Sequence, residues 1–188
     1  MGRTTIARDL IELIRLGKIE KAEILRNLEA GTRGAEQLRR GDPALILTFE
    51  QLQASSPPRS SLARGTALGE PTYRTLRDVP MYALTDADRV DVLRFGRHPD
   101  QDVQLLGRTV SREHGLVIFG GDVLFCDYGT LRGGEHKGSL NGTYLDGQAL
   151  IRDTMITWLT VHTLQLGQVN DRFEFRVRYR LLPRTVTN

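Results

Sequence analysis

Hydrophobic positions follow two different periods along this chain. Over residues 3–54 they recur with helical spacing, so that one face of each predicted helix is apolar. The first apolar stripe is formed by Ile6, Leu10, Leu13 and Ile14. Gly17 follows it as a stop signal, and a second helical segment is expected over residues 19–30. The pattern therefore predicts a helix hairpin at the start of the chain.

The next apolar segment fits two structures. Asp42 and Pro43 combine a helix N-cap residue with the proline favoured at the first helical position. The apolar residues that follow at i, i+4 and i+7 favour a helix, and they are Leu45, Phe49 and Leu52. A strand through residues 44–49 is the competing prediction, because so short an apolar run fits both. We favour the helix, so residues 1–54 are expected to form a helical N-terminal region.

From about Thr72 the hydrophobic period changes to that of strands. Short apolar runs are separated by turn residues such as Gly, Asp and Asn, and several runs alternate apolar and polar positions. The runs are Val90–Phe95, Gly115–Phe119, Val123–Cys126, Thr143–Leu145, Thr163–Leu166 and Phe173–Tyr179. Regularly spaced short strands of this kind indicate an antiparallel sandwich or barrel. The predicted fold class is therefore mainly β, preceded by a small α-helical region.

The segment between these two regions has the composition of a linker. It contains two adjacent prolines, which lack a backbone donor, and several serines, which offer no core. The chain is therefore divided into a helical region at 1–54, a linker at 55–71 and a β domain at 72–188.

Composition and charge argue against several classes of function. The 26 basic and 23 acidic residues are too balanced to predict nucleic-acid binding, which needs a concentrated basic face. No apolar run is long enough for a bilayer span, so we expect no membrane insertion. The N-terminus lacks the apolar core of a secretory signal, and the single cysteine, Cys126, fits a reducing compartment. The expected location is the cytoplasm.

Neither a metal site nor an enzyme is predicted. The four histidines and Cys126 lack any short zinc-binding spacing, and no phosphate-binding loop of the Gly-Lys-Ser/Thr type occurs. His114 lies three residues from Ser111, but no orienting acid or oxyanion donor is evident for a hydrolase. We therefore expect no cofactor and no catalytic residue.

Three loops of the β domain hold the residues with the most distinctive chemistry. Arg97 follows a glycine at the end of a strand and offers a planar set of donors that matches phosphate oxygens. Ser111, just ahead of another strand, offers a hydroxyl donor. Asn141, in a turn, can both donate to and accept from a peptide backbone. Together these side chains suit an anion that is attached to an extended peptide.

The order of these motifs resembles the forkhead-associated (FHA) family. The motifs are Gly96-Arg97, then Ser111-Arg112-Glu113-His114, then Asn141-Gly142-Thr143. The similarity extends over about residues 81–179. It implies an antiparallel β-sandwich of about eleven strands that binds phosphothreonine peptides through the loops at one end. It also implies a preference for phosphothreonine over phosphoserine, because the methyl group of phosphothreonine fills a small apolar niche and phosphoserine lacks that group.

The resemblance also implies a role for each of these residues. Arg97 and Ser111 are expected to contact the phosphate, with Arg112 as a second basic contact. Asn141 is expected to hold the main chain of the ligand, and Ser139 is placed at the ligand as well. The residues that support the site without touching the ligand are Gly96, His114 and Gly142.

The sequence departs from the family pattern in one place. The usual order is Asp-x-Gly-Ser-x-Asn-Gly, whereas here nine extra residues, 130–138, separate Asp127-Tyr128-Gly129 from Ser139. We favour a surface loop, because a long insertion costs little closure entropy. The alternative is that Arg132 and Lys137 add contacts to the phosphate or to acidic residues of the ligand.

These expectations combine into one function and one alternative. The first is a cytoplasmic adaptor or regulator from a bacterium that binds a threonine-phosphorylated protein, either a Ser/Thr kinase or its substrate. The alternative is a scaffold that uses an FHA-like fold for assembly without phosphate. The region 1–54 would pack on the sandwich, self-associate or dock a partner, and we favour a homodimer through it.

Overall fold

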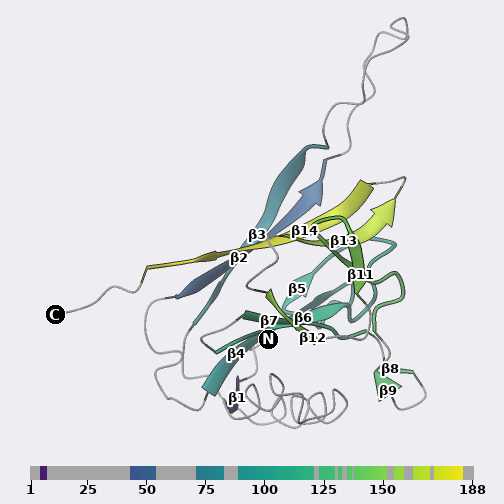
Figure 1. The fold of residues 1–188 in the computed structure, drawn as a ribbon. Coiled ribbons are helices and arrows are strands. Elements are labelled where there is room, and N and C mark those ends of the chain that lie inside the picture. Colours follow the sequence, from purple (N-terminus) through teal and green to yellow (C-terminus); the bar gives the residue numbers. More distant parts are fainter. Residues whose placement is uncertain are drawn as a thin grey trace, which may run out of the picture.

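The computed structural model of the protein is a β-sandwich (Figure 1). It describes residues 5–7, 43–53, 71–82, 89–120, 123–129, 131–132, 135–136, 138–151, 155–158, 163–169 and 172–183. Within these residues the strands form two six-stranded sheets and a separate two-stranded hairpin. In the view of Figure 1, the sheet with β2, β3, β13 and β14 lies above the sheet with β4, β6 and β7. The predicted mainly β sandwich is confirmed.

The first sheet has the strand order β1-β4-β6-β7-β12, and β5 pairs with β4 at the side. Its strands are β1 (Thr5–Ala7), β4 (Arg89–Gly96), β5 (Val103–Gln104), β6 (Gly115–Phe119), β7 (Val123–Asp127) and β12 (Met155–Thr157). The pairing is antiparallel except between β4 and β5. The two loops that lead out of β4 and into β6 therefore lie at the same end of neighbouring strands.

The second sheet has the order β11-β10-β13-β14-β2-β3 and is antiparallel throughout. Its strands are β11 (Ala149–Ile151), β10 (Thr143–Leu145), β13 (Thr163–Val169), β14 (Arg172–Leu181), β2 (Leu45–Leu52) and β3 (Tyr73–Met81). The hairpin consists of β8 (Leu131–Arg132) and β9 (Glu135–His136). All six apolar runs that were predicted to be strands are confirmed, as β4, β6, β7, β10, β13 and β14.

The core lies between the two sheets and is built largely from aromatic and branched aliphatic side chains. Its largest fully buried members are Trp158, Phe49, Phe95, Phe125 and Phe175. Phe49 on β2 and Phe95 on β4 meet edge to face, with ring centroids 5.5 Å apart, which joins the sheets directly. Phe95 is the last residue of β4 but one and is followed by Gly96 and Arg97, so the first candidate loop leaves from a fixed point in the core.

The helix predicted over Leu45, Phe49 and Leu52 is wrong, and the competing strand is correct. β2 is paired on both sides, with β14 and with β3, and its alternate residues Leu45, Leu47 and Phe49 are fully buried. Alternating burial is the period of a strand with one face on the core. The pattern at i, i+4 and i+7 was misleading because residues 45 and 49, four apart, lie on the same face of a helix and also on the same face of a strand.

The remainder of the expected helical region is described only in part. Ile6 lies in β1, which pairs with β4, so its place in a helical stripe is also wrong. Residues 8–42 lie outside the described residues, and a homodimer through residues 1–54 stays a prediction. The expected linker also lies outside them except for its last residue. Near the two ends of this expected linker, the Gln53 N–H donates to the Thr72 carbonyl oxygen at 2.8 Å. The described residues include no helix long and apolar enough to cross a membrane.

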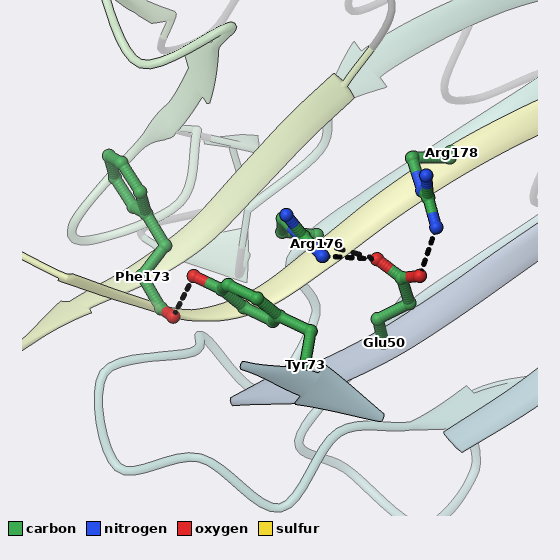
Figure 2. A network of polar contacts seen from close by, with 5 residues as sticks. All are labelled: Glu50, Tyr73, Phe173, Arg176 and Arg178. Carbon is green, nitrogen blue, oxygen red and sulfur yellow. Dashed lines mark hydrogen bonds and ion pairs between the residues drawn. The ribbon is translucent and has the colours of Figure 1, made fainter. Parts of the chain in front are cut away.

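A polar network ties β2, β3 and β14 together (Figure 2). Glu50 is buried, with 5% of the residue exposed, and its carboxylate accepts from both Arg176, at 3.0 Å, and Arg178. The Arg176 guanidinium also lies 3.6 Å from the centroid of the Tyr73 ring, and the Tyr73 hydroxyl donates to the Phe173 carbonyl at 2.8 Å. Two cations offset the desolvation of one buried carboxylate, and the tyrosine fixes the beginning of β14.

Candidate functional site

The first two candidate loops run side by side. The Arg97 N–H donates to the Ser111 carbonyl at 2.9 Å, and the His98 N–H donates to the Arg112 carbonyl at 2.9 Å. Gly96 makes this approach feasible. A β-carbon there would collide with the Arg112 carbonyl and lie 2.9 Å from the His114 nitrogen, both of which are backbone atoms. The expected supporting role of Gly96 therefore has a steric basis.

The third loop is joined to the second by two hydrogen bonds. The Leu140 N–H donates to Ser111 Oγ at 2.8 Å, and Asn141 Nδ2 donates to the Thr109 carbonyl at 2.6 Å. Because a carbonyl oxygen can only accept, the Asn141 atom that faces it must be the amide nitrogen. The three loops singled out in the sequence thus form one connected surface.

His114 lies beneath this surface, fully buried. Its Nδ1 accepts the Ser111 N–H at 3.2 Å, so the ring hydrogen is on Nε2, which lies 3.2 Å from Thr143 Oγ1. Burial lowers the pKa of His114 to about 4, although a hydrogen bond to the main chain of Gly142 acts in the opposite direction. Neutral His114 therefore holds the Ser111 backbone and leaves the Ser111 hydroxyl to the Leu140 N–H.

A buried carboxylate supports the third loop. Asp127 accepts from the Ser139 N–H, from Ser139 Oγ at 2.9 Å and from Thr143 Oγ1 at 3.3 Å. The Ser139 side chain was expected at the ligand, but the residue is only 3% exposed and its hydroxyl is directed to Asp127. The structure thus places Ser139 beneath the loop. Gly142 completes the turn with a φ of 74°, a backbone conformation that glycine adopts without strain.

The side chains left at the surface of these loops are basic and polar. Arg97 and Arg112 are exposed, and Ser111 and Asn141 are half-buried. In the part of the chain that the structure describes, neither guanidinium forms an ion pair. The geometry therefore combines a backbone fixed by hydrogen bonds with guanidinium and hydroxyl groups that are available to an anion.

Comparison with protein-family models matches residues 93–166 to the FHA domain. The chain contains an FHA domain. The matched segment includes all three loops, whereas β2, β3 and β14 complete the sandwich outside it. Comparison with curated proteins gave no match.

Among solved structures, the chain is similar to several FHA domains. An engineered FHA domain with a Myc-pTBD peptide is 16% identical, with a TM-score of 0.46 over 76% of this chain and 94% of that chain. A structure from work on phosphothreonine-dependent FHA domain interactions is 18% identical, with a TM-score of 0.37 over 74% and 98%. The FHA1 domain of yeast Rad53 is 16% identical, with a TM-score of 0.45 over 93% and 87%.

The insertion in this FHA domain leaves and rejoins the site at a single point. Gly129 has a φ of 67°, and a β-carbon on it would lie 2.6 Å from the Gly138 Cα, so the two glycine backbones are in contact. The hairpin β8–β9 lies between these glycines in the sequence, and Figure 1 shows it at the periphery of the sandwich. This arrangement keeps Asp127 bonded to Ser139 despite the added residues. The side chains of Arg132 and Lys137 lie outside the described part, so their ligand contacts stay a prediction.

Two residues of the FHA site were not identified from the sequence. Thr109 accepts the Asn141 amide through its carbonyl, and Thr143 connects His114 to Asp127. These contacts join residues from different loops, and a main-chain acceptor such as Thr109 leaves no side-chain signal. Asp127 appears in the sequence pattern, but its role as the shared acceptor becomes evident only from the geometry.

Proposed function

We propose that the FHA domain of this protein binds threonine-phosphorylated segments of other proteins, and that the protein is an adaptor or regulator in Ser/Thr kinase signalling. The observation that carries this proposal is the double connection of Ser111. Its carbonyl accepts the Arg97 N–H, and its hydroxyl oxygen accepts the Leu140 N–H beside Asn141. One serine therefore joins the three loops whose side chains suit a phosphorylated peptide.

The phosphate is assigned to Arg97, Ser111 and Arg112. Because Ser111 Oγ accepts the Leu140 N–H, its own hydrogen is left to donate to a phosphate oxygen. Phosphothreonine carries about −1.5 to −2 charges at pH 7 and three strong acceptor oxygens. Two exposed guanidiniums and a hydroxyl complement it in both charge and hydrogen-bonding capacity.

The main chain of the ligand is assigned to Asn141. Its Nδ2 donates to the Thr109 carbonyl, so its Oδ1 is left to accept an N–H from outside the domain. An extended peptide offers such a donor beside each residue, whereas free phosphate does not. The partner is therefore a phosphorylated protein segment, and a Ser/Thr kinase or its substrate would supply one.

Three peptide pools test this function by calorimetric titration. The pools share randomised flanking residues and differ only in a central Thr, phosphoserine or phosphothreonine. We expect the phosphothreonine pool to bind most tightly and the Thr pool least tightly. Equal affinity for the Thr and phosphothreonine pools would refute the proposal.

Substitution of the phosphate contact gives a second measurement. Arg97→Ala should weaken binding of the phosphothreonine pool roughly tenfold to over a hundredfold, because a charge-assisted hydrogen bond contributes about 1.5–3 kcal/mol. Arg180→Ala is the matched control, since Arg180 is also exposed but lies near the C-terminal end of β14 and not in any of the three loops. An Arg97→Ala protein that still assembles and functions without phosphate would instead favour the phosphate-independent scaffold.

A further inference from the structure

The orientation of Asn141 depends on a loop that is itself held from the opposite sheet. Asn141 Nδ2 donates to the main-chain carbonyl of Thr109 at 2.6 Å. The Thr109 hydroxyl donates to Glu174 Oε2 on β14 at 3.3 Å. A continuous path of two hydrogen bonds therefore connects a strand of the second sheet to the amide that is assigned to the ligand backbone.

The turn that contains Thr109 packs closely against the end of the Glu174 side chain. A β-carbon on Gly107, two residues before Thr109, would lie 2.5 Å from Glu174 Oε2. The Gly107 carbonyl also accepts the Val110 N–H at 3.3 Å, which closes the turn that contains Thr109. The turn therefore rests directly on the carboxyl group, with no room for a side chain between them.

The strand that carries Glu174 is anchored at the same place. The Tyr73 hydroxyl donates a hydrogen bond to the carbonyl of Phe173 at 2.8 Å (Figure 2), and Phe173 immediately precedes Glu174 in β14. Within the sheet, Phe173 pairs with Gln168 of the neighbouring strand β13. Glu174 thus follows a residue that is held by pairing with β13 and by the Tyr73 side chain of β3, and it can act as a fixed support.

We infer that Glu174 is a positioning residue for ligand binding: it fixes Thr109, whose carbonyl turns the Asn141 amide so that Oδ1 faces a peptide N–H. This inference rests on the proposed function for the identity of the ligand. The positioning itself concerns only the protein and can be measured without any ligand. Glu174 makes no contact with the ligand in this role.

Side-chain amide NMR signals of the full chain test the positioning directly. The Asn141 pair is identified by its loss in Asn141→Ala. One of its hydrogens is bonded to Thr109, so the two should differ in chemical shift and exchange slowly with water. Glu174→Ala should move the two shifts toward each other and speed exchange, whereas Glu174→Gln, which keeps an acceptor for the Thr109 hydroxyl, should preserve them. Unchanged Asn141 signals in Glu174→Ala would overturn the inference.

Binding of the phosphothreonine pool gives the second readout. Glu174→Ala should weaken binding roughly three- to tenfold, which is the effect of one ordinary hydrogen bond. Thr109→Val removes the hydroxyl at nearly constant shape and should match Glu174→Ala, while Glu174→Gln should bind like the wild type. In an Asn141→Ala background, Glu174→Ala should cost nothing further, because the group that it positions is gone. Additive losses in the double variant would contradict the positioning role.

The two readouts separate the two proposals. If wild-type protein binds no phosphothreonine pool, the proposed function fails, while the Asn141 signals still decide the role of Glu174. If the pool binds but Glu174→Ala leaves both the signals and the affinity unchanged, the function stands and the positioning role is refuted.

Discussion

Acid should weaken the fold through His114, whose neutral form is built into the site. The buried ring accepts the Ser111 N–H at Nδ1, and a second proton there would place two donors face to face. The pKa is lowered from 6.5 to about 4 in the folded protein, chiefly by burial. The unfolded chain therefore binds more protons between these values, so stability is full above pH 6.5 and is lost as the pH falls toward 4. A difference of this size corresponds to roughly 3 kcal/mol of unfolding free energy.

Urea unfolding of wild-type protein and His114→Gln between pH 8 and pH 4.5 measures this contribution. Other titrating groups are common to both proteins, so the difference between their unfolding free energies isolates His114. We expect the difference to be constant above about pH 7 and to shrink steadily below pH 6.5. A direct NMR titration of the His114 ring in the wild type should show a midpoint well below that of an ordinary histidine. A difference that stays constant from pH 8 to pH 4.5 would refute the reasoning.

Three further predictions concern the loops and the N-terminal region. Gly96→Ala should lower the free energy of unfolding by about 1–3 kcal/mol, because its β-carbon meets backbone atoms that cannot move aside, and chemical denaturation measures this. Deletion of residues 130–137 should leave fold and phosphothreonine affinity unchanged by circular dichroism and calorimetry, and a tenfold loss of affinity would instead indicate ligand contacts from Arg132 or Lys137. In light scattering, residues 43–188 should be folded and monomeric and the full chain dimeric. Residues 55–188 lack β2 and should not fold.

The strands that could be predicted are those with an apolar signal of their own. β4, β6, β7, β10, β13 and β14 each contain a short apolar run bounded by turn residues. β3 has no such signal: it contains Pro80, and most of its residues before Val79 are exposed because it is an edge strand. β2 was misassigned because its apolar positions fit both periods, and only its pairing with β3 and β14 on either side distinguishes them.

The sequence predicted which three loops form the candidate site, but it did not predict all of the residues that join them. The order of Arg97, Ser111 and Asn141 indicated three loops, and their convergence follows from the strand order. The inward direction of Ser139 could not be predicted, because it depends on Asp127 being buried beneath the loop. Contacts through main-chain atoms, such as the Thr109 carbonyl, likewise leave no trace in residue type.

Under the proposed function, the buried part of the site explains why a phosphate would act as a switch. Ser111, His114, Thr143, Asp127 and Ser139 form one chain of hydrogen bonds, which fixes the loop backbones before any ligand arrives. Only the exposed side chains, Arg97 and Arg112 above all, then lose freedom on binding, at about 0.5–1.5 kcal/mol each. Charge-assisted hydrogen bonds of about 1.5–3 kcal/mol each exceed that cost when a phosphate is present. Without the phosphate the same loops offer a few neutral contacts to a peptide, so binding should follow the modification of the partner rather than its sequence alone.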